Sequence, residues 1–379
     1  MNASPGPLDG VLVLDLTRVL AGPFATLCLA DLGARVIKVE RPGTGDDSRA
    51  YGPFAPDGRS YYFARVNRGK ESLAVDLKDP FGLALVRRIA ARADVLVESF
   101  RPGVMGRLGL GAEEVRAANR RLVYASISGF GQTGPWAQRP AYDAVVQALA
   151  GTVAITGRPG EGSVKPGVPI SDLSAGLYAF GGISAALLGA ARTGQGATLD
   201  IAMHDATVSL LEGAALRWLA TGAEPPLIGD AHQAIAPFDT YATSDGRIVI
   251  CAANDALWGV LCATLDAPAL LARAEYATNA GRHAHLGPLR ADLEAALATG
   301  TTDSWVERLG AAGLPCGTVA SVGEALSAPQ VAARGMLVEA DGLRLPGQPL
   351  LSGRGPRQVA AAPALDEHGS ALRVEFAAG

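Results

Sequence analysis

The segment that decides the fold spans residues 15–49 and reads DLTRVLAGPFATLCLADLGARVIKVERPGTGDDSR. The apolar run over residues 10–17 predicts a strand buried on both faces, and ARVIKVER over residues 34–41 predicts a second strand. Between them, Pro23 suits the first turn of a helix and Gly33 suits its end. Strand, turn, helix and strand in this order are typical of the start of a nucleotide-binding α/β domain.

The turn after the first strand lacks the glycines that hold a pyrophosphate. Dinucleotide-binding domains place G-x-G-x-x-G there, whereas this chain has TRVLAGP over residues 17–23. Residues 129–134 (GFGQTG) match the pattern in letters, but Pro135 and Trp136 follow where a helix should begin. We therefore expect a nucleotide-like ligand other than NAD or FAD, and a ligand-facing loop at residues 129–134.

Strands and helices alternate along the first half of the chain. Further strands are predicted over residues 72–78, 94–100, 122–128 and 199–203, with intervening helices that include residues 80–93 and 113–119. This alternation indicates an α/β fold, a Rossmann-like doubly wound parallel sheet with helices on both faces. Residues 205–220 are expected to form one amphipathic helix, residues 238–253 a hairpin, and the end of the chain a loop-rich segment. We predict a large domain over residues 1–200, a linker over 201–224, a small α+β domain over 225–320 and a return to the large domain over 321–379.

Composition limits the class of protein. Hydrophobic residues make up 49% of the chain and charged residues 18%, so a large core is available. The net charge of −4 gives no general attraction to nucleic acid or anionic membranes. The N-terminal MNASPGPLDG has no signal-peptide pattern, and the apolar residues 177–191 are too few for a membrane span. His283 and His285 have no further metal-ligating residue nearby, so we expect no metal site. The charge and the lack of a signal peptide or membrane span predict a cytoplasmic protein without nucleic-acid or membrane partners.

Asp172 is the candidate with two opposed interpretations. It lies between an apolar loop and a helix rich in small residues, in PGVPISDLSAGLY. Asp is favoured at helix N-caps, and a cap is the commoner role for such a residue. The alternative is a carboxylate nucleophile or base, with small neighbours that let a substrate approach the backbone.

Six blocks of the sequence resemble the class III (CaiB/BaiF) CoA-transferase family: DLTRVLAGPFAT, LGARVIKVERPGTGDDSR, NRGKESLAVDLKDPFG, DVLVESFRPGVMGRLGLG, ISGFGQTGPWAQRPAYDAV and GVPISDLSAGLYA. They occur in order over nearly the whole chain and look most similar to the branch acting on dicarboxylates such as succinate and glutarate. The resemblance implies an enzyme that moves CoA from an acyl-CoA thioester to a free carboxylic acid. It also implies a homodimer whose two chains are interlocked.

The resemblance places Asp172 at the family's catalytic aspartate. This carboxylate attacks the thioester to give a mixed anhydride, and the released thiolate then forms an aspartyl-CoA thioester. The chemistry is covalent catalysis by a carboxylate, which we expect to be ionised at neutral pH given an ordinary pKa of about 3.9. It needs donors for the tetrahedral oxyanion and exclusion of water.

The resemblance also implies a set of binding residues. Contacts to coenzyme A would fall at Val19, Leu20, Arg41, Val75, Ser99 and Arg107. Recognition of a free carboxylate on the substrate is assigned to Arg18 and Arg49, with Tyr142 beside them. For each arginine a surface ion pair is the alternative.

Two rival functions remain. An α-methylacyl-CoA racemase would place a histidine at Tyr142 and a glutamate near Asn254, so this chain lacks the partners for proton transfer. A CoA-binding protein without catalysis would be indifferent to Asp172→Asn. The chain also lacks the glycine run of the loop that shields the site in formyl-CoA transferase, and residues 228–237 (IGDAHQAIAP) occupy that region.

Overall fold

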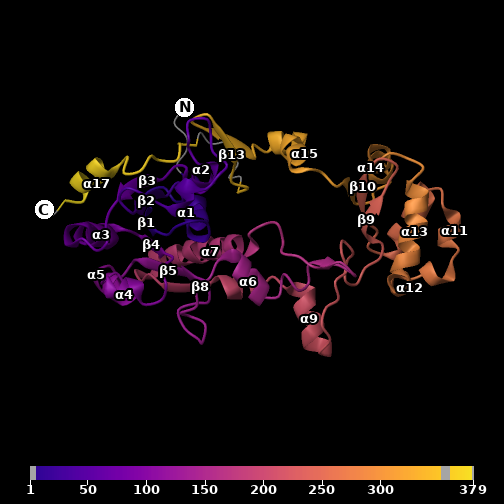
Figure 1. The fold of residues 1–379 in the computed structure, drawn as a ribbon, viewed down its shortest axis with the longest axis horizontal. Helices are drawn as coiled ribbons and strands as arrows, with labels where there is room; N and C mark the ends of the chain where they lie inside the picture. Colours follow the sequence, from indigo (N-terminus) through magenta and orange to yellow (C-terminus); the bar gives the residue numbers. More distant parts are fainter. Residues whose placement is uncertain (1–5, 351–358, 378–379) are drawn as a thin grey trace. The chain divides into compact units, whose positions relative to one another are not determined.

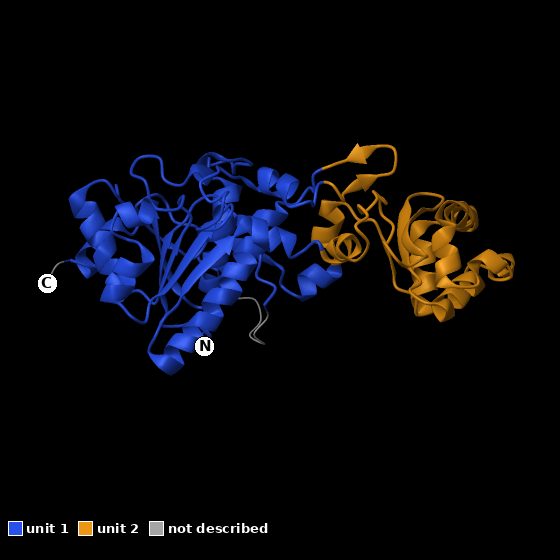
Figure 2. Cartoon of the chain, turned by 90° about the horizontal axis from the view of Figure 1, so that it is seen from below, with its two compact units in different colours: residues 1–153, 165–211, 329–379 blue, residues 154–164, 212–328 orange. Residues whose placement is uncertain are grey.

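The computed structural model describes residues 6–350 and 359–377. The first five residues of the N-terminal segment, and residues 351–358 and 378–379 of the predicted return segment, lie outside the described residues. The chain divides into two compact units (Figure 2). Unit 1 contains residues 1–153, 165–211 and 329–379, and unit 2 contains residues 154–164 and 212–328. Whether the predicted domain boundaries mark independently folding domains stays a prediction.

Unit 1 is built on a six-stranded parallel sheet with strand order β3-β2-β1-β4-β5-β8. Its strands are β1 (Leu12–Leu16), β2 (Arg35–Glu40), β3 (Glu71–Ala74), β4 (Val95–Glu98), β5 (Val123–Ser128) and β8 (Thr198–Ala202). The strand order reverses between β1 and β4, which pair from Val13↔Val95 to Leu16↔Glu98. A crevice at such a reversal is where doubly wound sheets place ligands. The predicted parallel α/β sheet is therefore confirmed.

Helices cover both faces of this sheet (Figure 1). On one face, α1 (Ala21–Asp31) and α7 (Ile170–Thr193) share a core with β1, β4 and β5, including Val13, Ala25, Val97, Ala179 and Ile183. On the other, α3 (Pro80–Arg92), α5 (Ala112–Ala118) and α17 (Gly369–Glu375) pack on the same strands through Leu14, Leu85, Ile89, Val115 and Phe376. Both faces are buried, which explains the near-continuous apolar strands.

Helix α7 is longer than the sequence suggested. It has 24 residues. Among the described residues it is long and apolar enough to cross a membrane, judged by length and composition alone. In the structure it lies against α1 and β5, and Ala175, Ala179 and Ile183 are fully buried in the core. The expectation that this apolar stretch is too short for a span is wrong, because the helix begins at Ile170 rather than near residue 177.

Unit 2 contains an antiparallel sheet of β9 (Phe238–Ala242), β10 (Arg247–Cys251) and β11 (Cys316–Thr318) in the order β11-β10-β9. Its helices include α10 (Asp255–Thr264), α13 (Leu286–Leu297) and α14 (Thr302–Ala311). Trp258, Tyr276 and Trp305 are buried at the centre of its core. The predicted hairpin over residues 238–253 is confirmed as β9 and β10.

Two sequence-based expectations fail. The single helix over residues 205–220 is two helices, α8 (Met203–Val208) and α9 (Glu212–Thr221). The backbone leaves the helical conformation between them, and at the start of α9 Glu212 has a φ of +42°, outside the right-handed helical region. The loop-rich end of the chain contains α15 (Val322–Ser327), α16 (Pro329–Ala333), the hairpin of β12 (Leu337–Ala340) and β13 (Leu343–Pro346), and α17. Their short length explains why no periodic pattern revealed them.

Candidate active site

The turn between β1 and α1 is stabilised by buried charges in place of glycines. The Asp46 carboxylate accepts the backbone N–H of Val19 at 3.1 Å and pairs with the Lys38 ammonium at 2.9 Å. Lys38 also donates to the Thr17 carbonyl at 2.9 Å. Both charged side chains are almost fully buried. The Asp46 carboxylate thus lies at the N-terminal end of α1, where a dinucleotide-binding domain would place the pyrophosphate.

A second buried pair lies directly beneath this turn. The Lys70 ammonium pairs with Asp15 at 3.0 Å and donates to the Pro23 carbonyl and the Thr26 hydroxyl. Burial alone would raise the pKa of Asp15, but the charges of Lys70 and Lys38 outweigh it and hold that pKa well below its ordinary range. The strand end and the first turn of α1 are therefore tied into one rigid platform.

Several predicted CoA-binding residues share one edge of the sheet. Arg41 follows β2, Val75 follows β3 and Ser99 follows β4, so parallel pairing brings them to the edge formed by the β1–α1 turn. The Ser99 hydroxyl accepts the backbone N–H of Arg18 at 3.3 Å, across the point where the strand order reverses. α/β sheets bind ligands at this position, outside the carboxyl ends of the strands where the strand order reverses.

The side chains of these residues differ in exposure. The guanidinium groups of Arg18 and Arg41 are exposed, and both pair with the carboxylate of Asp47, Arg18 at 2.9 Å. Leu20 and Val75 are buried, with 2% and 6% of their surface exposed, so they face the core. Arg107 is exposed at the end of α4 (Val104–Arg107). Among the predicted CoA-binding residues, the arginines are therefore exposed, whereas Val19 and Ser99 are half-buried.

Arg49 lies apart from this group. Its guanidinium donates to both carboxylate oxygens of Glu40, at 2.7 and 2.8 Å, and stacks on the Phe63 ring at 3.7 Å. It lines a cavity of about 510 Å³ together with Arg59 and residues of β13. Since Glu40 already takes the bidentate face of the guanidinium, recognition of a substrate carboxylate by Arg49 stays a prediction.

Asp172 is the third residue of α7, and it does not cap the helix. Pro169 is the N-cap and supplies no side-chain hydrogen bond. The missing acceptor comes instead from Asp143 of α6 (Asp143–Leu149), whose Oδ1 accepts the backbone N–H of Ser171 at 3.0 Å and of Asp172 at 3.4 Å. The N-cap interpretation of Asp172 is therefore wrong. Its own carboxylate is left for another role.

The Asp172 carboxyl has an altered proton affinity. Burial, and then the negative charge of Asp143, raise its pKa to about 7. The expected full ionisation at neutral pH is thus corrected: near pH 7 the protonated and ionised forms coexist. A carboxyl with a pKa shifted this far in a polar cluster is a functional-site candidate.

Tyrosines connect Asp172 with the arginine group. Tyr62 of α2 (Tyr61–Asn67) has a pKa raised by burial and then by the charge of Asp172. Its ring contacts Tyr51 edge-on at 5.6 Å between centroids. The pKa of Tyr51 is raised by burial, then by Asp47 and by Tyr142. The exposed Tyr142 therefore lies near Tyr51, and its role beside Arg18 and Arg49 stays a prediction.

A glycine brings Asp172 to the β1–α1 turn. Gly176 lies one helical turn beyond Asp172, and a Cβ atom there would lie 2.8 Å from the carbonyl oxygen of Ala21, the first residue of α1. Only glycine permits this approach of two backbones. The close contact places the N-terminal parts of α7 and α1 side by side; that Asp172 and the β1–α1 turn serve one site stays a prediction.

Sequence reasoning missed Asp143 and Tyr62. Asp143 lies in the block AYDAV, and an acidic residue at the start of a helix next to Tyr142 is a recognisable signal. Nothing in the local pattern of Tyr62 distinguishes it from a core aromatic. Its proximity to Asp172 depends on the packing of elements distant in sequence.

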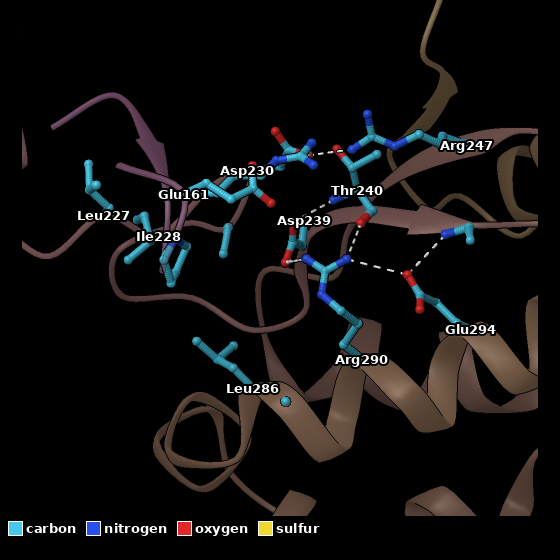
Figure 3. Close-up of a pocket in the computed structure, with 16 residues that line it drawn as sticks. Glu161, Leu227, Ile228, Asp230, Asp239, Thr240, Arg247, Leu286, Arg290 and Glu294 are labelled. Atoms are coloured by element: carbon cyan, nitrogen blue, oxygen red, sulfur yellow. Dashed lines mark hydrogen bonds and ion pairs between the residues drawn. The ribbon is translucent and has the colours of Figure 1, made fainter. Parts of the chain in front are cut away.

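Residues 228–237, which we expect in place of the glycine run of formyl-CoA transferase, lie in unit 2. Ile228 and Asp230 line a cavity of about 670 Å³ between the β6–β7 hairpin (Gly157–Arg158 and Gly162–Ser163), the β9–β10 strands and α13 (Figure 3). One oxygen of Asp230 accepts from both Arg158, at 3.4 Å, and Arg247. Asp230 thereby ties the loop to two strands of its own unit. Asn254, the residue matching the racemase glutamate, caps α10 by accepting the N–H of Leu257.

Metal binding has no visible basis in the part of the chain that the structure describes. Among the described residues, no group of three or more His, Cys, Asp or Glu side chains could hold a metal ion. Residues 129–134, the glycine-rich loop, follow β5 and lead into no helix, and Gln132 donates its N–H to Asp200 at 2.9 Å. The segment therefore differs from a dinucleotide-binding loop, in which a helix begins at the last glycine.

Known proteins resemble this chain over almost its whole length. The profile of CoA-transferase family III matches residues 8–369. Acetyl-CoA:oxalate CoA-transferase of Acetobacter aceti is 48% identical over 98% of this chain and 96% of its own length. Succinate–glutarate CoA-transferase of Agrobacterium fabrum is 38% identical over 99% and 96%.

Solved structures have the same fold. A CAIB/BAIF family protein from Brucella suis is 39% identical and superposes with a TM-score of 0.88 over 98% of this chain and 100% of its own. The sequence blocks, the parallel sheet and the match over almost the entire length lead to one conclusion. The chain belongs to CoA-transferase family III.

Proposed function

We propose that this protein transfers CoA from an acyl-CoA thioester to a free carboxylic acid, with dicarboxylates as acyl donors or acceptors. The observation that carries the proposal is Asp172, a mostly buried carboxyl that caps no helix and lies beside the turn expected to bind CoA. Relatives named as oxalate and succinate–glutarate CoA-transferases support the dicarboxylate class.

The reaction proceeds through three covalent states of Asp172: an anhydride with the donor acid, a thioester with CoA and an anhydride with the acceptor acid. Its ionised carboxylate attacks the thioester carbonyl, the C–S bond breaks, and a mixed anhydride and the CoA thiolate form. The thiolate attacks the aspartyl carbonyl, which releases the donor acid and leaves an aspartyl-CoA thioester. The acceptor carboxylate attacks that carbonyl and expels the thiolate, which then takes the acceptor's acyl group and restores the Asp172 carboxylate.

The surroundings of Asp172 suit these steps. Attack requires the ionised form, and a pKa of about 7 leaves about half of the molecules ionised at neutral pH. Exclusion of water protects the anhydride and the thioester from hydrolysis. The N–H groups of Ser171 and Asp172 already serve the Asp143 carboxylate, so we assign the oxyanion donors to other groups.

CoA is assigned to the edge of the unit 1 sheet. Arg18 and Arg41, exposed and held together by Asp47, are suited to phosphate or carboxylate groups, and Arg107 adds a third exposed cation. The backbone at Val19 and Leu20 and the Ser99 hydroxyl lie at the same edge. Asp46 occupies the N-terminal end of α1, so we place no CoA phosphate there.

The functional unit is proposed to be an interlocked homodimer. Helix α7 exposes an apolar stripe that includes Leu177, Tyr178 and Leu188, each at least half exposed. In α9, Leu216, Trp218 and Leu219 are exposed to a similar degree. Apolar surfaces of this kind are typical of subunit interfaces.

The function is tested by measuring CoA exchange from succinyl-CoA or acetyl-CoA to a panel of mono- and dicarboxylic acids. We expect exchange to oxalate, glutarate or succinate, and its loss in Asp172→Asn. Exchange of the α-proton with deuterated solvent, without need of an acceptor acid, would indicate a racemase instead. Binding of acyl-CoA with no reaction of any acid would indicate a protein that only binds CoA.

A further inference from the structure

Gln147 is a wholly buried polar residue next to the proposed nucleophile. It lies in α6, one turn after Asp143, and none of its surface is exposed. Its amide nitrogen donates to Asp143 Oδ2 at 2.6 Å and to the Val168 carbonyl at 3.2 Å. Its amide oxygen is buried and has no hydrogen-bond partner among the described residues. Since an unpaired buried acceptor is unfavourable, packing alone does not account for an amide here.

The two bonds of the Gln147 amide converge on the start of α7. Val168 directly precedes the N-cap Pro169, and Asp143 Oδ1 accepts the N–H groups of Ser171 and Asp172. One amide group therefore holds both the entering backbone and the carboxylate that caps the helix. Because Asp172 is in that first turn, its position depends on this arrangement.

We propose that Gln147 is a positioning residue for Asp172, acting through Asp143, and this rests on the function proposed above. Its N–H groups hold the Asp143 carboxylate in the orientation that caps α7. They also hold the negative charge of Asp143 beside Asp172, and after burial that charge is the second cause of the raised pKa of Asp172. Gln147 is fully buried, so it acts on chemistry rather than on substrate binding.

The groups that face Asp172 define what the amide controls. Asp143 approaches it from α6 and Tyr62 from α2, and burial comes from the packing of α7. Asp143 supplies the one negative charge among them that raises the proton affinity of Asp172. If Asp143 loses this donor, its carboxylate is no longer held beside Asp172, and the pKa of Asp172 falls.

Two variants of similar size separate this role from simple packing. Gln147→Met removes the donor, and we expect kcat to fall about tenfold while KM stays unchanged. The acidic limb of the pH profile of kcat moves to lower pH by about half a unit or more. Gln147→Glu adds a carboxyl group and moves the limb in the opposite direction. Gln195→Met, the same substitution at an exposed position after α7, leaves rate and profile unchanged.

Three results would overturn the proposal. One is a Gln147→Met enzyme with wild-type kcat, another is a slower enzyme whose acidic limb stays in place, and the third is a rise in KM alone. If the Met variant fails to fold, the isosteric Glu variant carries the test alone. A carbon-13 titration of the Asp172 carboxyl, with Asp172→Asn to assign the signal, gives the same answer without turnover. If the wild-type protein transfers no CoA, the proposed function fails while this titration still decides the role of Gln147.

Discussion

Asp172 combines two properties that compete in one side chain. It must be ionised to attack a thioester, yet burial and the charge of Asp143 favour its protonated form. A nucleophile with reduced solvation is more reactive when ionised, whereas only part of the population is ionised at neutral pH. The raised pKa of Asp172 therefore affects both activity and stability.

The first prediction concerns the pH dependence of transfer. We expect kcat to rise about tenfold per pH unit on the acidic side and to level off above an apparent pKa of about 7, since only the ionised carboxylate attacks. In Asp143→Asn, which loses the like charge, the limb should move to lower pH. Initial rates between pH 5 and 8.5 measure this. A wild-type limb near the ordinary aspartate pKa of about 4 would contradict the account.

The second prediction concerns stability. The folded-state pKa of Asp172 is raised, so between about pH 4 and pH 7 the folded state binds more protons than the unfolded state, and the residue lowers stability as pH rises. Asp172→Asn should therefore have a higher urea midpoint than wild type at pH 8, with the difference shrinking toward pH 5. Asp205→Asn, at a side chain that is 82% exposed, is the control and should show no such trend. Equal midpoints for Asp172→Asn and wild type at pH 8 would argue against a buried, destabilising carboxylate.

At the scale of elements, the contact between α1 and α7 assembles the site. Gly176 allows the first turns of the two helices to approach, while the pairs Lys38–Asp46 and Lys70–Asp15 fix the β1–α1 turn. The turn is therefore rigid without the glycines of a dinucleotide-binding loop. Its one close-contact glycine is Gly22, where a Cβ atom would lie 2.3 Å from that of Thr17.

The third prediction tests this helix contact. Gly176→Ala should lower the free energy of unfolding by about 1–3 kcal/mol, because its methyl group meets the Ala21 carbonyl and cannot be accommodated by a side-chain movement. It should also lower kcat by moving Asp172 relative to the turn. Gly181→Ala in the same helix points into open space and should be neutral or slightly stabilising. Denaturation curves and rates for both variants measure this, and equal behaviour of the two would refute the role of the contact.

How much the sequence predicted depends on the range of the interactions. The strands β1, β2, β4 and β5, the helix α3 and the β9–β10 hairpin follow from local patterns, and the structure confirms them. The Asp143–Asp172 and Tyr62–Asp172 relations join residues far apart in the chain, which no local pattern encodes. No local pattern encodes the position of Asp46 either, because it lies at the N-terminal end of α1 through its pair with the buried charge of Lys38.

At the scale of the whole molecule, the apolar stripe on α7 requires an explanation. Leu177 and Leu188 are each 54% exposed, although the other side of the helix is in the core. Two interlocked copies would bury this stripe, which is how a helix apolar all round is accommodated in a water-soluble assembly.

The fourth prediction is that the protein is a dimer in solution. Light scattering after gel filtration should give twice the chain mass, and dilution should not dissociate an interlocked pair. Leu188→Glu should reduce the yield of dimer, whereas Val374→Glu, at a residue of α17 that is 78% exposed, should not. A monodisperse, active monomer would show that another partner or solvent meets the stripe.

The central claim is that Asp172 carries the CoA during transfer. The direct measurement is to mix the enzyme with succinyl-CoA or acetyl-CoA, quench with hydroxylamine or borohydride, and map modified peptides by mass spectrometry. The account predicts modification of the peptide containing Asp172, absent in Asp172→Asn and removed by addition of an acceptor acid before the quench. Transfer that proceeds with no modification of this peptide, or with modification at another carboxyl group, would contradict it.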